Sequence, residues 1–197
     1  MKKIIFYFLS AKALALIGAI LATSFLPLNK GFTAYKDFGL QLPYYLWIWG
    51  NFDGVHYLNI AARGYQSLEY PFFPLFPLII RGLFEVFNAF KIFIPYLSLG
   101  VIISNISFLA SFFVLWKILI LDGQKRLFSL LLLIIVVFPT SFFYGAVYND
   151  SIFFLLATLT LLYSRKRNFL VSSLFGGLAT LTRLNGLALA FLILFEY

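Results

Sequence analysis

The chain has 197 residues, of which 62% are hydrophobic and only 11% charged, against about 25% charged in an average soluble protein. This composition excludes a soluble globular domain, and the absence of cysteine together with a single histidine excludes thiolate and histidine-cluster metal sites, so we expect no metal and no cofactor. The net charge of +8 comes largely from Lys and Arg in short loops beside apolar runs, which is typical of membrane topology signals and not of a nucleic-acid partner.

The first predicted element is an apolar helix over residues 4–26, preceded by Lys2 and Lys3. A basic start followed by an apolar run and small residues also fits a cleavable signal peptide. However, the run is about 20 residues long, which is enough to span a bilayer, and the rest of the chain is equally apolar. We therefore favour a retained transmembrane helix, with Lys12 extending to the cytoplasmic interface.

Residues 27–91 are predicted to form the first outer loop, which carries most of the polar character. Residues 43–49 are too short to span, and their Tyr and Trp side chains fit an interfacial aromatic belt. Asp53 is predicted to cap a short amphipathic helix that ends near Gly64, because Gly suits the αL residue after a helix end. Pro77 is predicted to open the next helix, over residues 78–87.

The remaining apolar segments alternate with short polar turns. They are residues 92–121, 127–138, 151–163, 169–181 and a last run from 187. Several have only about 13 residues, fewer than the 17 to 25 of a free-standing span, so they extend into the flanking loops or form half-spans that line a cavity. We expect an all-α, polytopic bundle of transmembrane helices with amphipathic helices in its first outer loop.

Basic residues set the predicted orientation. If the spans alternate, one side collects Lys2, Lys3, Lys125, Arg126, Arg165, Lys166 and Arg167. The positive-inside rule makes this side cytoplasmic. The loops of Asp53, Asp150 and Arg183 then converge on the outer face of a multi-pass membrane protein, in the plasma membrane or, in a eukaryote, the endoplasmic reticulum membrane.

The converging residues suit one chemistry. An Asp beside the bilayer can act as a general base toward a hydroxyl group. Arg63, Arg81 and Arg183 can bind an anionic group such as a lipid phosphate, because guanidinium pairs with phosphate through two hydrogen bonds. A carboxylate, arginines and aromatic rings at an interface suit the transfer of a sugar from a lipid phosphate to a hydroxyl.

Simpler interpretations of the same residues stay open. Asp53 can be a plain helix cap, and Asn149 with Asp150 can merely cap the helix from Ser151. His56 is either an interfacial filler or a proton shuttle. Glu69 can be a solvated turn residue. Arg183 is harder to explain in this way, because a lone charge between apolar segments needs a partner.

Three stretches resemble, in order, the signatures of one enzyme family. FDGVHYLNIAARGY, followed by Glu69 and PFFPLFPLIIR, resembles the W-D-G-x-H-[FY] signature of the phosphatidylinositol-glycan class V mannosyltransferases and their prokaryotic relatives. FPTSFFYGAVYNDSIFFLLA and GGLATLTRLNG are similar to two further motifs of this family. Three matches in the same order are more specific than any single motif.

The resemblance implies a fold of the GT-C type and an inverting, metal-independent transfer. Such an enzyme moves a monosaccharide, here mannose, from a polyprenyl- or dolichyl-phosphate donor to a hydroxyl of a lipid-linked or surface acceptor. Asp53 would be the catalytic base. The resemblance assigns donor contacts to His56, Glu69, Arg183 and Asn185, with the phosphate on Arg183, and Asp150 takes the place of the family's Glu. The substrate-binding set that we expect is His56, Arg63, Glu69, Arg81, Asp150, Arg183 and Asn185.

Departures from the family pattern leave alternatives. Phe52 replaces the usual Trp before the Asp, and family members are commonly longer, so residues 1–197 are expected to form one transmembrane domain that covers an N-terminal part. This length also suits a non-catalytic membrane subunit that assists a glycosyltransferase complex. A membrane phosphotransferase or flippase-like protein would need more basic residues or a second carboxylate cluster.

Overall fold

The structure is a computed structural model that describes residues 2–26 and 44–197. Over these two ranges the chain forms helices without any strand, which confirms the predicted all-α class. The helices are α1 (Lys2–Phe25), α3 (Tyr44–Trp47), α4 (Asp53–Arg63), α5 (Leu75–Ala89), α6 (Tyr96–Leu121), α7 (Phe128–Val137), α8 (Asp150–Arg165), α9 (Phe169–Thr180) and α10 (Leu189–Glu196). Four 3-10 turns separate them: η1 (Ile48–Gly50), η2 (Lys125–Leu127), η3 (Ser141–Gly145) and η4 (Leu184–Ala188).

Two of these helices are long and apolar enough to cross a membrane, judged by length and composition. They are α1, with 24 residues and a mean hydropathy of 2.2, and α6, with 26 residues and a mean hydropathy of 2.0. Helices α7, α8, α9 and α10 have 10, 16, 12 and 8 residues, below the roughly 17 that a span needs. The later apolar runs are therefore short helices, as their lengths predicted.

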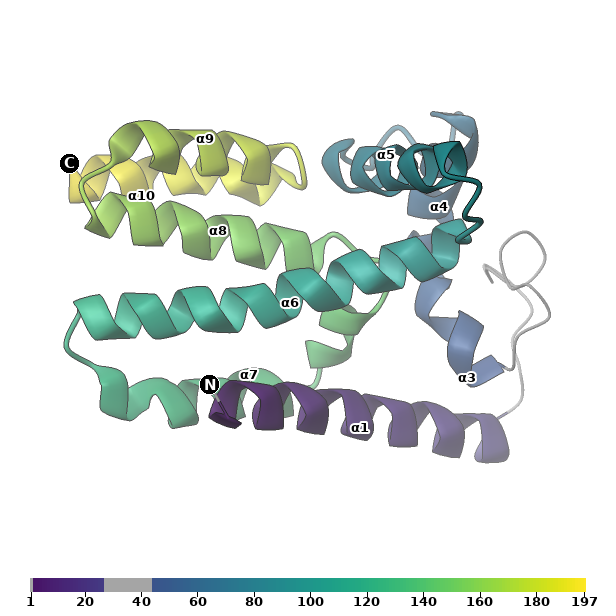
Figure 1. Cartoon of the computed structure of the whole chain (residues 1–197), viewed down its shortest axis with the longest axis horizontal. Helices are drawn as coiled ribbons and strands as arrows, with labels where there is room; N and C mark the ends of the chain where they lie inside the picture. The colour runs from purple at the N-terminus through teal and green to yellow at the C-terminus, as the bar shows by residue number, and fades with distance from the viewer. Residues whose placement is uncertain (1, 27–43) are drawn as a thin grey trace.

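The long helix α6 forms the centre of the bundle (Figure 1). It packs against α8 on one side and against α1 and α7 on the other, and α9 and α10 cover α8. The short helices α8 to α10 run beside only one half of α6. Helices α4 and α5 lie beyond their ends, beside the other half (Figure 1). The described part of the predicted first outer loop, residues 44–91, is called the outer segment below. Its helices α4 and α5 are thus placed beyond the ends of the short helices (Figure 1).

Two buried clusters hold these parts together. One lies between α4, α5 and α6 and includes the fully buried Leu58, Phe76 and Ile80. The other joins α1 to α6 and α7 around Phe108 and Phe112, with Ile4 of α1 only 1% exposed. Much of α1 remains outside these clusters, since only 17% of its apolar window is buried.

Several expected boundaries in the outer segment prove wrong. Helix α4 begins at Asp53 itself, and Phe52 occupies the cap position, because a turn between Asn51 and Gly54 starts the helix one residue earlier. Gly64 does end α4 with a positive φ of 81°, but its ψ of −177° is not αL. Helix α5 begins at Leu75 and takes in Pro77, because a proline is tolerated in a first helical turn.

Two other expectations concern the membrane interface. Lys12 does not extend to the end of α1: its ammonium group lies inside the bundle, between the rings of Phe8 and Phe108. Trp47 is 6% exposed and belongs to a buried cluster, so it is not part of an interfacial belt. The loop predicted over residues 27–43 lies outside the described residues, so the first outer loop is seen only from residue 44.

Candidate active site

Three polar segments that are far apart in the sequence meet beside the N-terminal part of α6, near Gly100 and Ser104. The backbone N–H of Val147 donates to the carbonyl of Trp49 at 2.8 Å, which joins the segment before α8 to η1. The Asn149 side-chain amide donates to the carbonyl of Thr182, which joins the segment before α8 to the one after α9. These bonds bring the loops of Asp53, Asp150 and Arg183 together.

Asp53 stands in the first turn of α4, where the positive end of the helix dipole favours a carboxylate. The preceding residue, Phe52, adopts a φ of 53° and a ψ of −121°, a conformation that costs a non-glycine residue about 1–3 kcal/mol. The Asp53 side chain is exposed, and it has neither a hydrogen bond nor an ion pair with any residue that the structure describes. The turn therefore positions the backbone of a residue whose carboxylate has no partner among the described residues.

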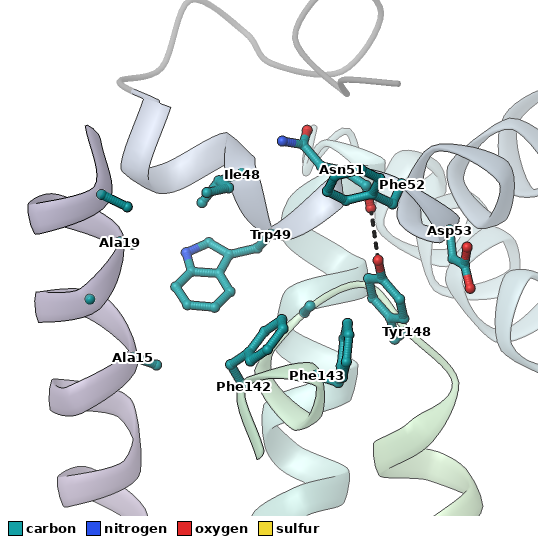
Figure 2. Close-up of a pocket in the computed structure, with 13 residues that line it drawn as sticks. Ala15, Ala19, Ile48, Trp49, Asn51, Phe52, Asp53, Phe142, Phe143 and Tyr148 are labelled. Carbon is teal, nitrogen blue, oxygen red and sulfur yellow. Dashed lines mark hydrogen bonds between the residues drawn. The ribbon is translucent and has the colours of Figure 1, made fainter. Parts of the chain in front are cut away.

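Asp53 borders a cavity of about 710 Å³ (Figure 2). Helix α1 forms one wall with small residues that include Ala15 and Ala19, and Asp53 lies on the opposite side, beyond Phe52 and Tyr148 (Figure 2). The lining between these sides is mostly aromatic and includes Trp49, Phe142, Phe143 and Tyr148 (Figure 2). Such a mostly apolar hollow with a carboxylate at its border suits an amphipathic ligand.

Tyr148 forms part of the wall beside Asp53. Its hydroxyl donates to the carbonyl of Asn51 at 3.3 Å (Figure 2). Burial and the negative charge of Asp53 raise the pKa of Tyr148 to about 12, although the backbone N–H of Asp53 partly offsets this rise. The phenol therefore stays protonated, and remains a donor, at neutral pH.

Arg183 is held by Asp150, with Nη1 2.7 Å from Oδ1. The guanidinium also lies over the ring of Phe153, at 5.4 Å from its centroid. Asp150 is the first residue of α8, and Arg183 directly precedes η4. The turn η4 requires glycine at position 186, because a Cβ there would collide with the backbone of Thr180. Asn149 occupies the N-cap position of α8, as one interpretation expected, but α8 begins at Asp150 and the Asn149 side chain binds the Thr182 carbonyl without capping the helix.

Tyr57 connects this ion pair to Asp53 electrostatically. It follows Asp53 by one turn on α4, and it is 4% exposed between the rings of Phe72 and Phe76. Burial is the largest cause that raises its pKa, and the charges of Asp53 and Asp150 raise it further, while Arg183 lowers it. Asp53 and the Asp150–Arg183 pair are thus close enough to act on one buried hydroxyl.

His56 and Glu69 form a second pair, with Nδ1 3.4 Å from Oε1. Glu69 is 4% exposed and accepts the backbone N–H of Gln66 through its other oxygen. The His56 ring stacks on Phe72 at a centroid distance of 4.7 Å. Glu69 is therefore a buried member of the outer segment, and the interpretation as a solvated turn residue is wrong.

No described contact joins the three other predicted binding residues, Arg63, Arg81 and Asn185, to the side chain of Asp53. Arg63 is ten residues further along α4, which is about 15 Å along the helix axis. Arg81 is exposed on α5 and acts on Tyr96. Asn185 is exposed in η4, two residues after Arg183.

Three functional candidates were missed by sequence reasoning. Tyr57 and Tyr148 lie within the matched motifs, but a tyrosine there is also expected as a core or interfacial residue. Lys12 was noticed only as a charge within an apolar helix, and its inward direction depends on the packing of Gly145 against α1. Within residues 2–26 and 44–197, no group of three His, Cys, Asp or Glu side chains is placed to hold a metal ion.

Comparisons with known proteins give one match. The family described as Mannosyltransferase (PIG-V) matches residues 1–196, which is nearly the whole chain. No curated protein and no solved structure matches the chain. The match covers all three segments that meet at Asp53.

Proposed function

The chain belongs to the mannosyltransferase (PIG-V) family of membrane glycosyltransferases, and on that premise we propose that Asp53 is the base of a sugar transfer from a polyprenyl- or dolichyl-phosphate donor. The sugar is mannose, as the family name indicates, and the acceptor is a hydroxyl of a lipid-linked or surface glycan. The reaction inverts the anomeric carbon and needs no metal. The family and the two apolar helices support a site at a membrane.

One observation carries this proposal: of the carboxylates around the three polar segments, Asp53 alone has no ion-pair partner among the described residues. Glu69 is paired with His56, and Asp150 is paired with Arg183. Asp53 is exposed and borders the cavity of about 710 Å³. An unpaired carboxylate in a fixed turn is suited to accept a proton.

The proposed reaction moves one proton and breaks one bond. The Asp53 carboxylate takes the proton of the acceptor hydroxyl, and the hydroxyl oxygen attacks the anomeric carbon of the donor from the face opposite the phosphate. The bond between this carbon and the phosphate oxygen breaks, and its electron pair leaves with the polyprenyl phosphate. Asp53 then releases its proton to solvent, for which its exposed position is suitable.

The remaining predicted residues take supporting roles in this proposal. The Asp150–Arg183 pair contacts the substrates, Asn185 can extend this contact from its exposed position two residues after Arg183, and the His56–Glu69 pair supports α4, on which Asp53 stands. Arg63 and Arg81 are exposed on the outer segment, where they can bind phosphates of the lipid surface or of an extended acceptor.

The proposed orientation follows from the positions of charge. Helices α6 and α7, and likewise α8 and α9, are connected at the end of the bundle that is opposite to α4 and α5 (Figure 1). These two connections carry Lys125, Arg126, Arg165, Lys166 and Arg167. By the positive-inside rule this end faces the cytoplasm, and Asp53 faces the outer side, where a flipped lipid donor would be available.

The test is sugar transfer in membranes that contain the full-length protein, with labelled polyprenyl-phosphate mannose as the probe. We expect Asp53→Asn, which keeps the size of the side chain but not its basicity, to lower transfer at least about 100-fold. Glu85→Gln is the matched control, since Glu85 is an exposed carboxylate on α5 away from the cavity. Equal transfer by wild type and Asp53→Asn would exclude Asp53 as the base, and no transfer by either would favour a non-catalytic subunit.

A further inference from the structure

The ammonium group of Lys12 lies inside the bundle rather than at its surface. Its Nζ is 5.3 Å from the ring centroid of Phe8 and 5.0 Å from that of Phe108. On the third side it touches the backbone of η3, since a Cβ built on Gly145 would lie only 2.7 Å from Nζ. No Asp or Glu among the described residues forms an ion pair with it.

This position is unfavourable for a cation unless something compensates. An ammonium group that leaves water for apolar surroundings loses hydration, and buried charges in proteins are normally paired. The rings of Phe8 and Phe108 offset part of the lost hydration free energy through cation–π attraction. An ionisable side chain within an apolar helix usually faces a cavity and serves a ligand.

Lys12 does face a cavity. A hollow of about 240 Å³ is lined by Lys12, Ala15, Leu16, Trp49, Val101, Asn105 and Gly145. It shares Ala15 and Trp49 with the larger cavity that Asp53 borders. Among the described residues that line either cavity, Lys12 is the one basic side chain. The two hollows therefore offer a ligand one carboxylate and one cation.

The two charged groups are offset along α6. Gly54, next to Asp53, packs against Val147, and Val147 also contacts Gly100 of α6. Lys12 instead reaches Gly145, whose carbonyl accepts a hydrogen bond from Asn105 of α6. Five residues separate Gly100 from Asn105, which is about 7.5 Å along the helix axis. Lys12 is thus displaced from Asp53 toward the middle of α6.

This offset has the direction that a lipid-linked sugar requires. In such a donor the phosphate lies between the sugar and the chain, and the chain lies in the bilayer. If the anomeric carbon is next to Asp53, the phosphate must lie further toward the middle of the membrane-crossing helix α6. The Asp150–Arg183 pair does not supply a free positive charge for it, because the guanidinium is already neutralised at 2.7 Å.

Resting on the proposed function, we propose that Lys12 of α1 binds the phosphate of the lipid-linked donor in the smaller cavity. The sugar then extends past Trp49 into the larger cavity toward Asp53. When the bond between the anomeric carbon and the phosphate oxygen breaks, the added negative charge on the phosphate falls next to Lys12. The ammonium keeps its proton and stabilises this charge, as a fixed cation in an apolar site does.

The proposal is tested by binding, without any transfer. The full-length protein in detergent is titrated with a polyprenyl phosphate and, separately, with the uncharged polyprenol of the same chain length. The readout is quenching of tryptophan fluorescence, because Trp49 lines both cavities. We expect the wild type to bind the phosphate on the order of 10- to 100-fold more tightly than the alcohol. Lys12→Met should bind both alike, and Lys12→Arg should keep most of the preference.

Two controls separate binding from folding. Lys117→Met removes an exposed lysine of α6 and should behave as the wild type. If Lys12→Met does not fold, as judged by its helical circular dichroism, Lys12→Gln takes its place, and the wild-type comparison of phosphate with alcohol needs no variant at all. The proposal is overturned if the wild type shows no preference for the phosphate, or if an uncharged variant keeps the whole preference.

Failure of this inference is distinct from failure of the proposed function. If Asp53→Asn leaves transfer unchanged while Lys12→Met loses the phosphate preference, the cavity holds a lipid phosphate but Asp53 is not the base. If transfer depends on Asp53 while Lys12→Met keeps the preference, the enzyme binds its donor phosphate elsewhere. Each experiment therefore decides its own claim.

Discussion

The two ion pairs near Asp53 differ in length, in exposure to solvent and in the elements that they join. The Asp150–Arg183 pair joins the ends of two short helices, is 2.7 Å long, and leaves 27% and 37% of its side chains exposed. The His56–Glu69 pair lies within the outer segment, is 3.4 Å long, and leaves only 17% and 6% exposed. The shorter pair is therefore the one that a ligand can reach, and the longer pair is the one that is enclosed.

This difference indicates separate roles for the two pairs. A partly exposed pair contributes little to stability, but its polar atoms remain accessible to a substrate group. An enclosed pair is costly to break, because removal of one member leaves a buried charge without compensation. We expect substitutions in the Asp150–Arg183 pair to change activity, and substitutions in the His56–Glu69 pair to change the stability of the fold.

The largest effect in this comparison is expected from Arg183→Met. Loss of the guanidinium removes a substrate contact and leaves the Asp150 charge near Asp53 without an offset, as the shared influence on Tyr57 shows. We expect transfer to fall about 100- to 1000-fold, the range for loss of one fixed charged contact in an active site. Sugar transfer in membranes measures this, with protein level determined in parallel.

Arg183→Lys sharpens the same prediction. Lysine keeps the charge but loses the planar group that pairs with Asp150 and stacks on Phe153. We expect transfer between that of the wild type and that of Arg183→Met, with an unchanged melting temperature. A marked loss of thermal stability in either variant would assign this pair to the fold and remove the contrast between the two pairs.

The contrast between the pairs could be predicted from the sequence only in part. The alternation of apolar spans and the distribution of basic residues predicted that the loops of Asp53, Asp150 and Arg183 share one face, and in the structure all three charges act on Tyr57. The sequence could not show that Glu69 is enclosed, because its burial depends on a turn that folds back to Gln66 and on the position of His56. A polar residue between aromatic residues and prolines gives the same pattern in an exposed loop.

Helix ends were predicted less well than helices, for a physical reason. The length and composition of α6 left no alternative to a long apolar helix. Asp53, in contrast, fits the cap position and the first turn equally well, and Phe52 takes the cap only because of its unusual φ. The position of the Lys12 ammonium group was predicted wrongly, because the long aliphatic side chain of lysine can reach either the interface or the interior. Its inward direction depends on the glycine at position 145, which leaves room for the ammonium group.

A smaller effect, on stability rather than chemistry, is expected from His56→Phe. Phenylalanine can keep the stacking on Phe72, but it leaves the Glu69 carboxylate buried with only the Gln66 N–H as a partner. We expect the free energy of unfolding to fall by about 3 kcal/mol. Thermal denaturation in detergent checks this, and an unchanged melting temperature would show that the pair does not stabilise the fold.

The smallest effect should come from Glu69→Gln, although it changes the more buried member of the pair. Glutamine keeps an oxygen for the Gln66 N–H and brings no charge into the interior. We expect a loss of only about 1 kcal/mol, the usual contribution of one hydrogen bond. The two substitutions are compared in one denaturation series, with Glu85→Gln as the control for an exposed carboxylate of the same helical unit. If Glu69→Gln proved more destabilising than His56→Phe, the ion pair itself and not the buried charge would hold α4 in place.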